Sequence, residues 1–288
     1  MIKLVVSDMD GTLLNTAAQI SPKNQKAIEK LKENGIEFAI ASGRDYESVY
    51  SVMKEFHVDD CEAILGNGAQ YVDRQGNVVM SCYMNKDVVK DVVNIFAKNS
   101  IPYMIFTTHG FYTEYETNYV RKAFIERANK YFGSTYEDYG KDGKMANMPC
   151  NHLQKIDDFD VFLKKDIEII KIEAFSLDMS TIFSSKELLK DIPTISYLSS
   201  FEDNIEVTDQ NAQKGYILEK VIQIKGYQKD EVAVLGDGMN DLSLFECFPY
   251  SYAPNNAETK IKSLAYQVVC DCEEDGFAEA IELILKQK

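Results

Sequence analysis

The sequence predicts an α/β protein whose parallel-sheet core is interrupted by an inserted α+β domain. Short apolar runs alternate with amphipathic stretches up to Gly68, which is typical of parallel βαβ units, and the same rhythm returns after Val207. Between these two parts the helices and strands no longer alternate regularly. A chain of 288 residues is long enough to bury two hydrophobic cores.

Local signals in the first part predict two βα units followed by a hairpin. Ser21 is a favourable N-cap, Pro22 suits the first helical position, and Gly35 suits the end of the same helix. The residues Arg-Gln-Gly-Asn at 74–77 favour the hairpin turn. The expected elements are strands at 4–7, 36–41 and 63–65, helices between 22 and 35 and at 45–56, and a hairpin at 71–80.

After the hairpin we expect an α+β segment and then a second series of βα units. The segment contains helices at 86–98, 118–131 and 181–190, strands at 103–107, 111–114 and 169–175, a further short helix and two closing strands. The second series contains helices at 215–224, 241–247, 257–264 and 276–286 and strands at 232–235, 250–253 and 267–270. The sequence therefore predicts a core domain of residues 1–82 and 209–288 and an inserted domain of residues 83–208.

The charge balance argues against two classes of partner. The chain has 46 acidic and 31 basic side chains, a formal charge of −15 that repels nucleic-acid phosphates and anionic membrane surfaces. The first apolar run is short and is broken by Asp8, unlike a signal peptide or a transmembrane span. We therefore expect a cytoplasmic protein with neither nucleic acid nor membrane as a partner. A small anionic substrate would need a local positive site.

Asp8 and Asp10 belong to the most informative motif, Asp-Met-Asp-Gly-Thr, directly after the first apolar strand. Ligands of open α/β sheets bind at the carboxyl ends of strands, so both carboxylates are expected at a ligand site. Two neighbouring carboxylates repel each other, which favours a divalent cation between them or a shared proton. An Asx-rich turn without a ligand explains the same residues and is the alternative.

A second acidic cluster, from Gly236 to Asp241, follows the strand expected at 232–235. Asp237 and Asp241 offer the oxygen ligands that Mg²⁺ prefers. The alternative is a helix start, in which Asn240 is the cap and Asp241 interacts favourably with the helix dipole.

Two further motifs contain groups that suit a phosphoryl group. Ser42 and Gly43 follow the strand at 36–41, where a hydroxyl and backbone N–H groups can approach an anion at a helix start. Lys214 opens a predicted helix and carries the positive charge that phosphoryl transfer requires. An ordinary turn and a solvated lysine are the alternatives. All four motifs lie at strand ends or helix starts of the predicted core.

The four motifs together resemble those of the haloacid dehalogenase (HAD) superfamily of phosphatases, and within it the Cof-type members of subfamily IIB, which carry a C2B cap. The matching segments are Asp8-x-Asp10-Gly11-Thr12, Ser42-Gly43-Arg44, Lys214-Gly215 and Gly236-Asp237-Gly238-x-Asn240-Asp241. Asn67-Gly68-Ala69 and Asp275-Gly276 resemble further landmarks of the subfamily. The chain departs from the family pattern at two places. Gly66 stands where the family often has Glu, and Pro254-Asn255-Asn256-Ala257 stands where Met-Gly-Asn-Ala is common.

The resemblance implies a Rossmann-like core, a cap formed by the inserted domain, Mg²⁺ as the cofactor and an aspartyl-phosphate intermediate. Asp8 would be the nucleophile, and Asp10 the general acid and base. The metal ligands would be a side-chain oxygen of Asp8, the backbone carbonyl of Asp10 and the carboxylate of Asp237, with Asp241 nearby or bound through water. The residues that hold the phosphoryl group would be Ser42, Gly43, Lys214 and Asn240.

The expected function is Mg²⁺-dependent hydrolysis of small phosphorylated metabolites such as sugar phosphates. A sugar phosphomutase or phosphotransferase of the same superfamily is one alternative, and a non-catalytic regulator that binds Mg²⁺ or phosphate is another. The motifs do not separate transfer to water from transfer to a sugar. The sequence names neither the physiological substrate nor the oligomeric state.

Overall fold

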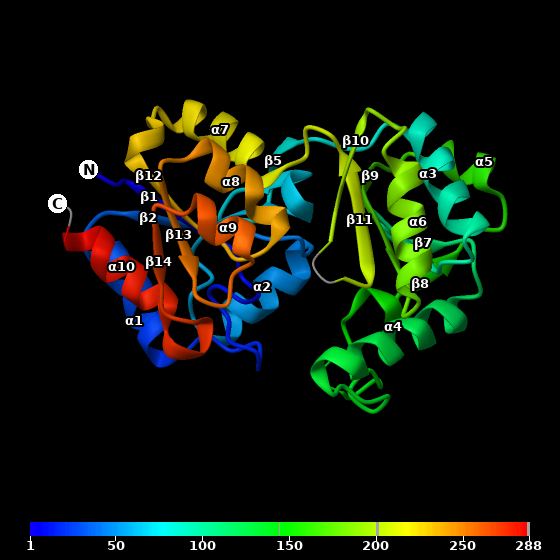
Figure 1. Ribbon diagram of the computed structural model, residues 1–288, viewed down its shortest axis with the longest axis horizontal. Coiled ribbons are helices and arrows are strands. Elements are labelled where there is room, and N and C mark those ends of the chain that lie inside the picture. Colours follow the sequence, from blue (N-terminus) through cyan, green and yellow to red (C-terminus); the bar gives the residue numbers. More distant parts are fainter. Residues whose placement is uncertain (144, 200–201, 287–288) are drawn as a thin grey trace. The chain divides into compact units, whose positions relative to one another are not determined.

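The chain divides into two compact units, each with its own sheet (Figure 1). The computed structural model describes residues 1–143, 145–199 and 202–286. The core unit consists of Met1–Ser81 and Asn211–Lys288, and the inserted unit of Cys82–Gln210. All four motifs belong to the core unit. The catalytic and capping roles expected for the two parts stay predictions.

The core unit is built on an eight-stranded sheet in the order β14-β13-β12-β1-β2-β3-β4-β5. The strands from β14 to β3 run parallel, and β4 and β5 add an antiparallel hairpin at one edge. Chain order reverses at β1, which pairs with both β12 and β2. Ligands of open α/β sheets bind at such a switch point. The strands are β1 (Leu4–Ser7), β2 (Glu37–Ala41), β3 (Glu62–Leu65), β4 (Gln70–Val72), β5 (Val78–Ser81), β12 (Val232–Leu235), β13 (Tyr250–Pro254) and β14 (Gln267–Val269).

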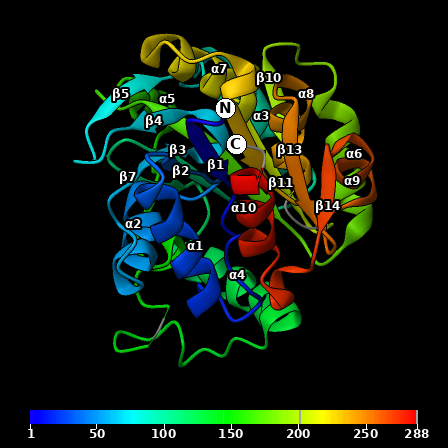
Figure 2. The same ribbon diagram turned by 90° about the vertical axis from the view of Figure 1, so that its left-hand side faces the viewer.

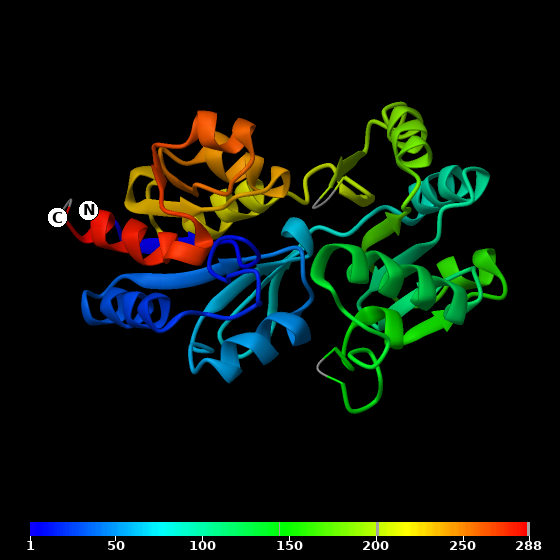
Figure 3. The same cartoon turned by 60° about the horizontal axis from the view of Figure 1, so that its bottom comes forward.

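Helices cover both faces of the core sheet, which explains why its central strands are continuous apolar runs rather than alternating ones. Figure 2 shows α1 beside α10, which share one hydrophobic cluster with α2. Figure 3 shows the blue helices α1 and α2 on one side of this sheet and the yellow and orange helices α7, α8 and α9 on the other. The helices are α1 (Pro22–Glu33), α2 (Tyr46–Glu55), α7 (Lys214–Lys225), α8 (Leu242–Cys247), α9 (Thr259–Leu264) and α10 (Gly276–Lys286).

The start of α1 confirms the local signals of the sequence. The Ser21 hydroxyl accepts the N–H of Asn24 at 3.1 Å, and Pro22 occupies the first helical position. Gly35 has a φ of +67°, and the N–H of Ile36 donates to the carbonyl of Leu31 at 2.9 Å. This left-handed residue ends the helix and turns the chain into β2.

The inserted unit has a mainly antiparallel sheet in the order β10-β11-β9-β6-β7-β8. Helices α3, α5 and α6 share one hydrophobic cluster with the sheet, and α4 packs with a second cluster. The helices are α3 (Lys86–Lys98), α4 (Thr117–Phe132), α5 (Phe159–Leu163) and α6 (Met179–Leu189). The strands are β6 (Tyr103–Thr107), β7 (Gly110–Thr113), β8 (Leu153–Lys155), β9 (Ile169–Phe175), β10 (Ile195–Leu198) and β11 (Asn204–Asp209). Among the described residues, no helix has both the length and the apolar character needed to cross a membrane.

The inserted unit differs from the sequence-based expectations in two local features. The strand β8 was not predicted, because Leu153–Lys155 is a three-residue edge strand with two exposed polar residues and shows no apolar periodicity. The helix α6 begins two residues earlier than expected. It does so because the Asp178 carboxylate accepts the N–H of Ser180 at 2.9 Å and caps the first turn.

Candidate active site

The four motifs meet at the carboxyl-terminal edge of the core sheet. Asp8 directly follows β1, Ser42 directly follows β2, and Asp237 lies just beyond β12. Lys214 is the first residue of α7. Adjacent parallel strands end at the same edge, so residues far apart in the sequence become neighbours there.

Lys214 lies fully buried between two carboxylates. Its Nζ donates to Oδ1 of Asp8 and to Oδ1 of Asp241, each at 2.6 Å. Burial by itself lowers the pKa of Lys214, but the charges of Asp241 and Asp8 outweigh burial, and the pKa is raised. The ammonium group is therefore charged at neutral pH. Lys214 thus holds a permanent positive charge beside Asp8, the residue predicted to be the nucleophile.

The electrostatic environment of Asp8 is unfavourable for a carboxylate in the absence of a further cation. Burial is the largest effect that raises the pKa of Asp8 well above its ordinary value of 3.8. Lys214 is the largest effect that opposes burial, and repulsion from Asp241, Asp237 and Asp10 raises the pKa further. Arg44 pairs with Asp10, which leaves the Lys214 ammonium to balance Asp8, Asp237 and Asp241, so the site favours a further positive charge.

The side chains of Asp8, Asp237 and Asp241 form a group that fits a divalent cation. Each offers a carboxylate oxygen, and these oxygens lie within 4.8 Å of one another. Burial, followed by the charge of Asp241, raises the pKa of Asp237 to about 7. Carboxylate oxygens are the ligands that Mg²⁺ prefers, and a bound cation would offset the repulsion among the three groups. The use of the Asp10 carbonyl as a ligand stays a prediction.

Backbone and hydroxyl donors hold the second acidic cluster in place. Oδ2 of Asp241 accepts the N–H groups of Asp237 at 3.0 Å and of Gly238 at 3.1 Å. The Thr12 hydroxyl donates to Oδ1 of Asp237 at 2.7 Å, which joins the turn after β1 to the turn after β12. Asp241 thus stabilises the turn and binds Lys214 with its other oxygen. Asn240 is not the helix cap, because Asp241 occupies the N-cap position of α8, and its side chain binds the preceding turn instead of capping that helix.

The Asp10 side chain points to Arg44 rather than to the three-carboxylate group. Nε of Arg44 donates to Oδ2 of Asp10 at 2.8 Å, and Nη2 donates to Oδ1 at 2.5 Å. Burial lowers the pKa of Arg44, but Asp10, together with the charges of Asp8 and Asp45, outweighs burial and the net shift is upward. A guanidinium that binds both carboxylate oxygens fixes the plane of the carboxylate. The residue predicted to transfer protons is therefore oriented by Arg44.

Ser42, Gly43 and Asn240 gather around Asn67, which follows β3. The Ser42 side chain is buried, and its hydroxyl accepts the N–H of Arg44 at 3.2 Å. Nδ2 of Asn240 donates to Oδ1 of Asn67 at 3.2 Å. A Cβ atom on Gly43 would lie 2.7 Å from the same Asn67 oxygen, so only glycine fits there without a shift. Ser42, Gly43 and Asn240 thus lie in adjoining segments at the sheet edge where Lys214 begins α7.

Sequence reasoning gave no individual role to three residues that the structure places in direct contact with the site. They are Thr12, Arg44 and Asn67. All three belong to the quoted motifs or landmarks, and this position in the sequence was the signal that could have pointed to them. Their partners could not be predicted, because hydrogen-bond geometry between loops has no periodic trace in the sequence.

Replacing Gly11 by Ala is expected to weaken divalent-metal binding. Gly11 has a φ of +77°, and a Cβ atom there would lie 2.5 Å from Oδ2 of Asp237. We expect the dissociation constant of a divalent cation such as Mn²⁺, measured by calorimetric titration, to rise, together with a loss of about 1–2 kcal/mol in the free energy of unfolding. Gly35→Ala is the matched control, since Gly35 has a φ of +67° and nothing within 4 Å of its Cβ position. An unchanged affinity for the divalent cation in Gly11→Ala would contradict the expectation.

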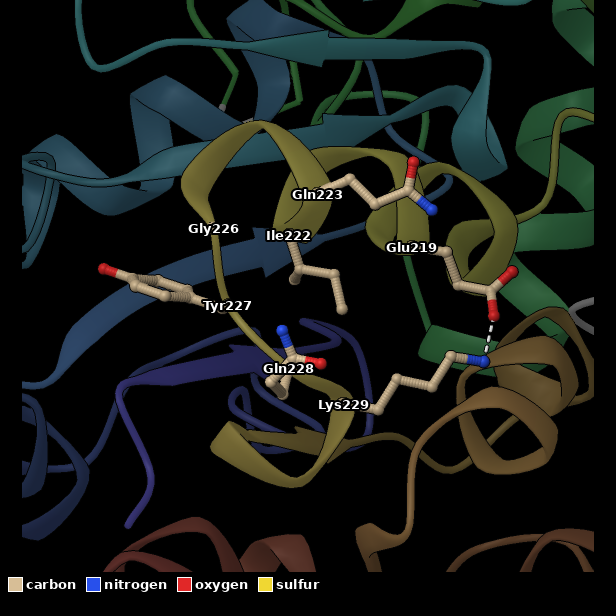
Figure 4. Close-up of a pocket in the computed structure, with 7 residues that line it drawn as sticks. All are labelled: Glu219, Ile222, Gln223, Gly226, Tyr227, Gln228 and Lys229. Atoms are coloured by element: carbon tan, nitrogen blue, oxygen red, sulfur yellow. Dashed lines mark hydrogen bonds and ion pairs between the residues drawn. The ribbon is translucent and has the colours of Figure 1, made fainter.

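A separate pocket lies at the other end of α7 and in the segment that follows it (Figure 4). It has a volume of about 370 Å³, and Figure 4 shows an ion pair between Lys229 and Glu219 across one side of it. The lining residues are Glu219, Ile222, Gln223, Gly226, Tyr227, Gln228 and Lys229. None of them belongs to the motifs, so this pocket is not the candidate active site.

Comparison with known proteins decides the family. The model of haloacid dehalogenase-like hydrolases matches residues 5–281. The chain belongs to this family. A curated relative, the phosphatase YwpJ of Bacillus subtilis, is 25% identical over 286 residues, which cover 99% of this chain and 100% of the relative. The family resemblance of the motifs is thereby confirmed.

Solved structures of the haloacid dehalogenase family share the fold. A haloacid dehalogenase-like hydrolase from B. subtilis superposes with a TM-score of 0.84 and 25% identity, covering 98% of this chain and 99% of that one. The HAD subclass IIB sugar phosphatase BT4131 gives a TM-score of 0.78 and 22% identity, covering 98% of each chain. The predicted α/β fold, with a parallel-sheet core, is confirmed.

Proposed function

We propose that this hydrolase is a Mg²⁺-dependent phosphatase that forms an aspartyl-phosphate on Asp8. The observation that supports this most is the position of the Lys214 ammonium, which bonds Asp8 and Asp241 at 2.6 Å in a fully buried site. A buried positive charge beside a carboxylate nucleophile lowers the repulsion that an incoming phosphate monoester would meet.

In the first step, a carboxylate oxygen of Asp8 attacks phosphorus, and the bond from phosphorus to the ester oxygen breaks. The leaving oxygen takes a proton from the carboxylic acid form of Asp10. In the second step, the Asp10 carboxylate accepts a proton from water while the water oxygen attacks phosphorus. The acyl-phosphate bond breaks, inorganic phosphate leaves, and Asp8 and Asp10 return to their starting forms.

Asp8, Asp237 and the carbonyl of Asp10 would hold Mg²⁺, with Asp241 nearby or bound through water. The ion, when bound, supplies positive charge that offsets the charge of the phosphoryl group. Ser42, Gly43, Lys214 and Asn240 would bind the phosphoryl oxygens. We propose small phosphorylated metabolites, sugar phosphates among them, as substrates.

The test is release of inorganic phosphate from p-nitrophenyl phosphate and from a panel of phosphorylated metabolites, with Mg²⁺ and with a chelator. We expect turnover that requires the metal. An isomeric sugar phosphate without phosphate release would instead establish a phosphomutase. Tight metabolite binding without any turnover would establish a regulator.

Replacing Arg44 by Met is expected to affect poor leaving groups much more than good ones. Arg44 orients Asp10, and proton donation by Asp10 matters most when the leaving oxygen is basic. We expect kcat/KM for an alkyl phosphate to fall about tenfold or more, with a much smaller loss for p-nitrophenyl phosphate. The control is Arg74→Met, which removes a more exposed guanidinium that pairs with Asp60. Equal losses on both substrates would show that Arg44 does not act through Asp10.

A further inference from the structure

Asn256 bridges two loops next to the candidate active site. It lies in the connection between β13 and α9, within the Pro254–Ala257 segment. Its Nδ2 donates to the carbonyl of Gly11 at 2.8 Å, and its Oδ1 accepts the N–H of Cys272 at 2.9 Å. A carbonyl can only accept and a backbone N–H can only donate, so these two partners fix the orientation of the amide.

The same connection also holds the segment that carries Asp237. The N–H of Glu258 donates to the carbonyl of Asp237 at 2.9 Å. On the other side, the Thr12 hydroxyl binds the Asp237 carboxylate, and Gly11 packs so closely that a Cβ atom would reach this carboxylate. Asn256 therefore completes a ring of contacts between the turn after β1, the turn after β12 and the connection after β13.

We infer that Asn256 is a positioning residue that keeps the carboxylates of Asp8 and Asp237 at the spacing a divalent cation needs. The inference rests on the proposed function. Mutually repelling carboxylates separate unless their backbones are held, and a site held in advance binds its ligand more tightly. The turn after β1 begins at Asp8 and is held at Gly11 by the Asn256 amide. In this role Asn256 acts through the backbone of the loops that it joins and is not itself a ligand of the cation.

A purely structural brace makes a different prediction. Asn256 is solvent-exposed, so its removal leaves the hydrophobic core intact and affects only the loops that it joins. If it were only a brace, its loss would lower thermal stability and leave metal affinity unchanged. As a positioning residue it affects the affinity for a cation even when no substrate is present.

The test compares Asn256→Asp with Asn255→Asp by calorimetric titration of the metal-free protein with Mn²⁺ and no substrate. Both changes add one negative charge to adjacent exposed residues of the same loop, but only the first replaces the amide that donates to Gly11. We expect the dissociation constant of Mn²⁺ to rise about three- to tenfold in Asn256→Asp relative to Asn255→Asp. Asn256→Ala, which adds no charge, should show the same direction relative to Asn255→Ala.

The outcomes separate the inference from the proposed function. Equal Mn²⁺ affinities in each variant and its control overturn the role of Asn256 and leave the phosphatase proposal standing. A wild-type protein that binds no Mn²⁺ overturns the metal site itself. A weaker Mn²⁺ affinity in both Asn256 variants, with unchanged affinity in both Asn255 variants, supports the inference.

Discussion

Asp8→Asn is expected to reduce phosphate release from p-nitrophenyl phosphate by more than about 10⁴-fold, that is, to background. The amide has the shape of the carboxylate but lacks its nucleophilic charge. The fold should survive, because Lys214 keeps its bond to Asp241. Burial, followed by neighbouring charges, already raises the pKa of Asp8, so ionisation of Asp8 opposes folding once the pH exceeds its ordinary value of 3.8. The metal-free variant should therefore unfold at no lower temperature than the wild type at neutral pH.

Two further measurements make this expectation specific to nucleophilic attack. Asp8→Ala excludes residual activity caused by deamidation of the new asparagine to aspartate. Asp10→Asn retains the nucleophile and lacks the group that activates water, so it should accumulate a covalent phosphate after a short incubation with radiolabelled substrate. Turnover above background in a folded Asp8→Ala protein, or no covalent label in Asp10→Asn, would contradict the proposed roles.

The sequence was sufficient to predict the core fold because its signals there are local and repeated. Buried apolar runs precede Asp8, Ser42 and Asp237, and the rule that parallel strands present ligands at their carboxyl ends brings these residues to one edge. The same signals were absent for β8, where Leu153 is the only apolar residue in the strand. Strands were predicted correctly where they are buried apolar runs. The prediction missed β8, a short edge strand that forms only by pairing with β7.

The candidate site was predictable as a set of residues and not as a set of contacts. Lys214 alone is indistinguishable from a surface lysine, and its full burial depends on two carboxylates that lie 206 and 27 positions away in the sequence. The bond between Arg44 and Asp10 depends similarly on the loops after β1 and β2. Such pairs follow from tertiary geometry, so a motif can name the participants while the structure is needed to show which of them touch.

Lys214→Met is expected to lower both activity and stability. Methionine fills a similar volume without the charge, so Asp8 and Asp241 would face each other in a buried site without the cation that both bind. Removing one partner of a buried ion pair typically lowers the free energy of unfolding by about 3–5 kcal/mol. Loss of the positive charge beside the nucleophile should lower kcat by about 10²- to 10³-fold or more. Lys220→Met is the control, since it removes a charge from an exposed position of the same helix.

The stability lost in Lys214→Met should depend on pH, because the pKa of Asp8 depends on Lys214. A carboxyl group whose pKa is raised by folding contributes its stability at pH values below its ordinary pKa, and loses it as the pH rises through the raised value. Burial, followed by Asp241 and Asp237, already raises the pKa of Asp8 in the wild type, where Lys214 opposes them. Without Lys214 the largest charge that opposes this rise is lost, so the stability difference between variant and wild type should grow from pH 5 to pH 8.

The double variant Lys214→Met/Asp241→Asn separates stability from catalysis. It removes the ammonium group and one of the two carboxylates it binds, so the buried repulsion falls and part of the lost stability should return. Activity should stay low, because the amide restores no positive charge beside Asp8. Recovery of activity in parallel with thermal stability would show that Lys214 acts only by maintaining the fold. Recovered stability with a kcat well below that of Asp241→Asn alone would establish that the Lys214 charge serves the reaction itself.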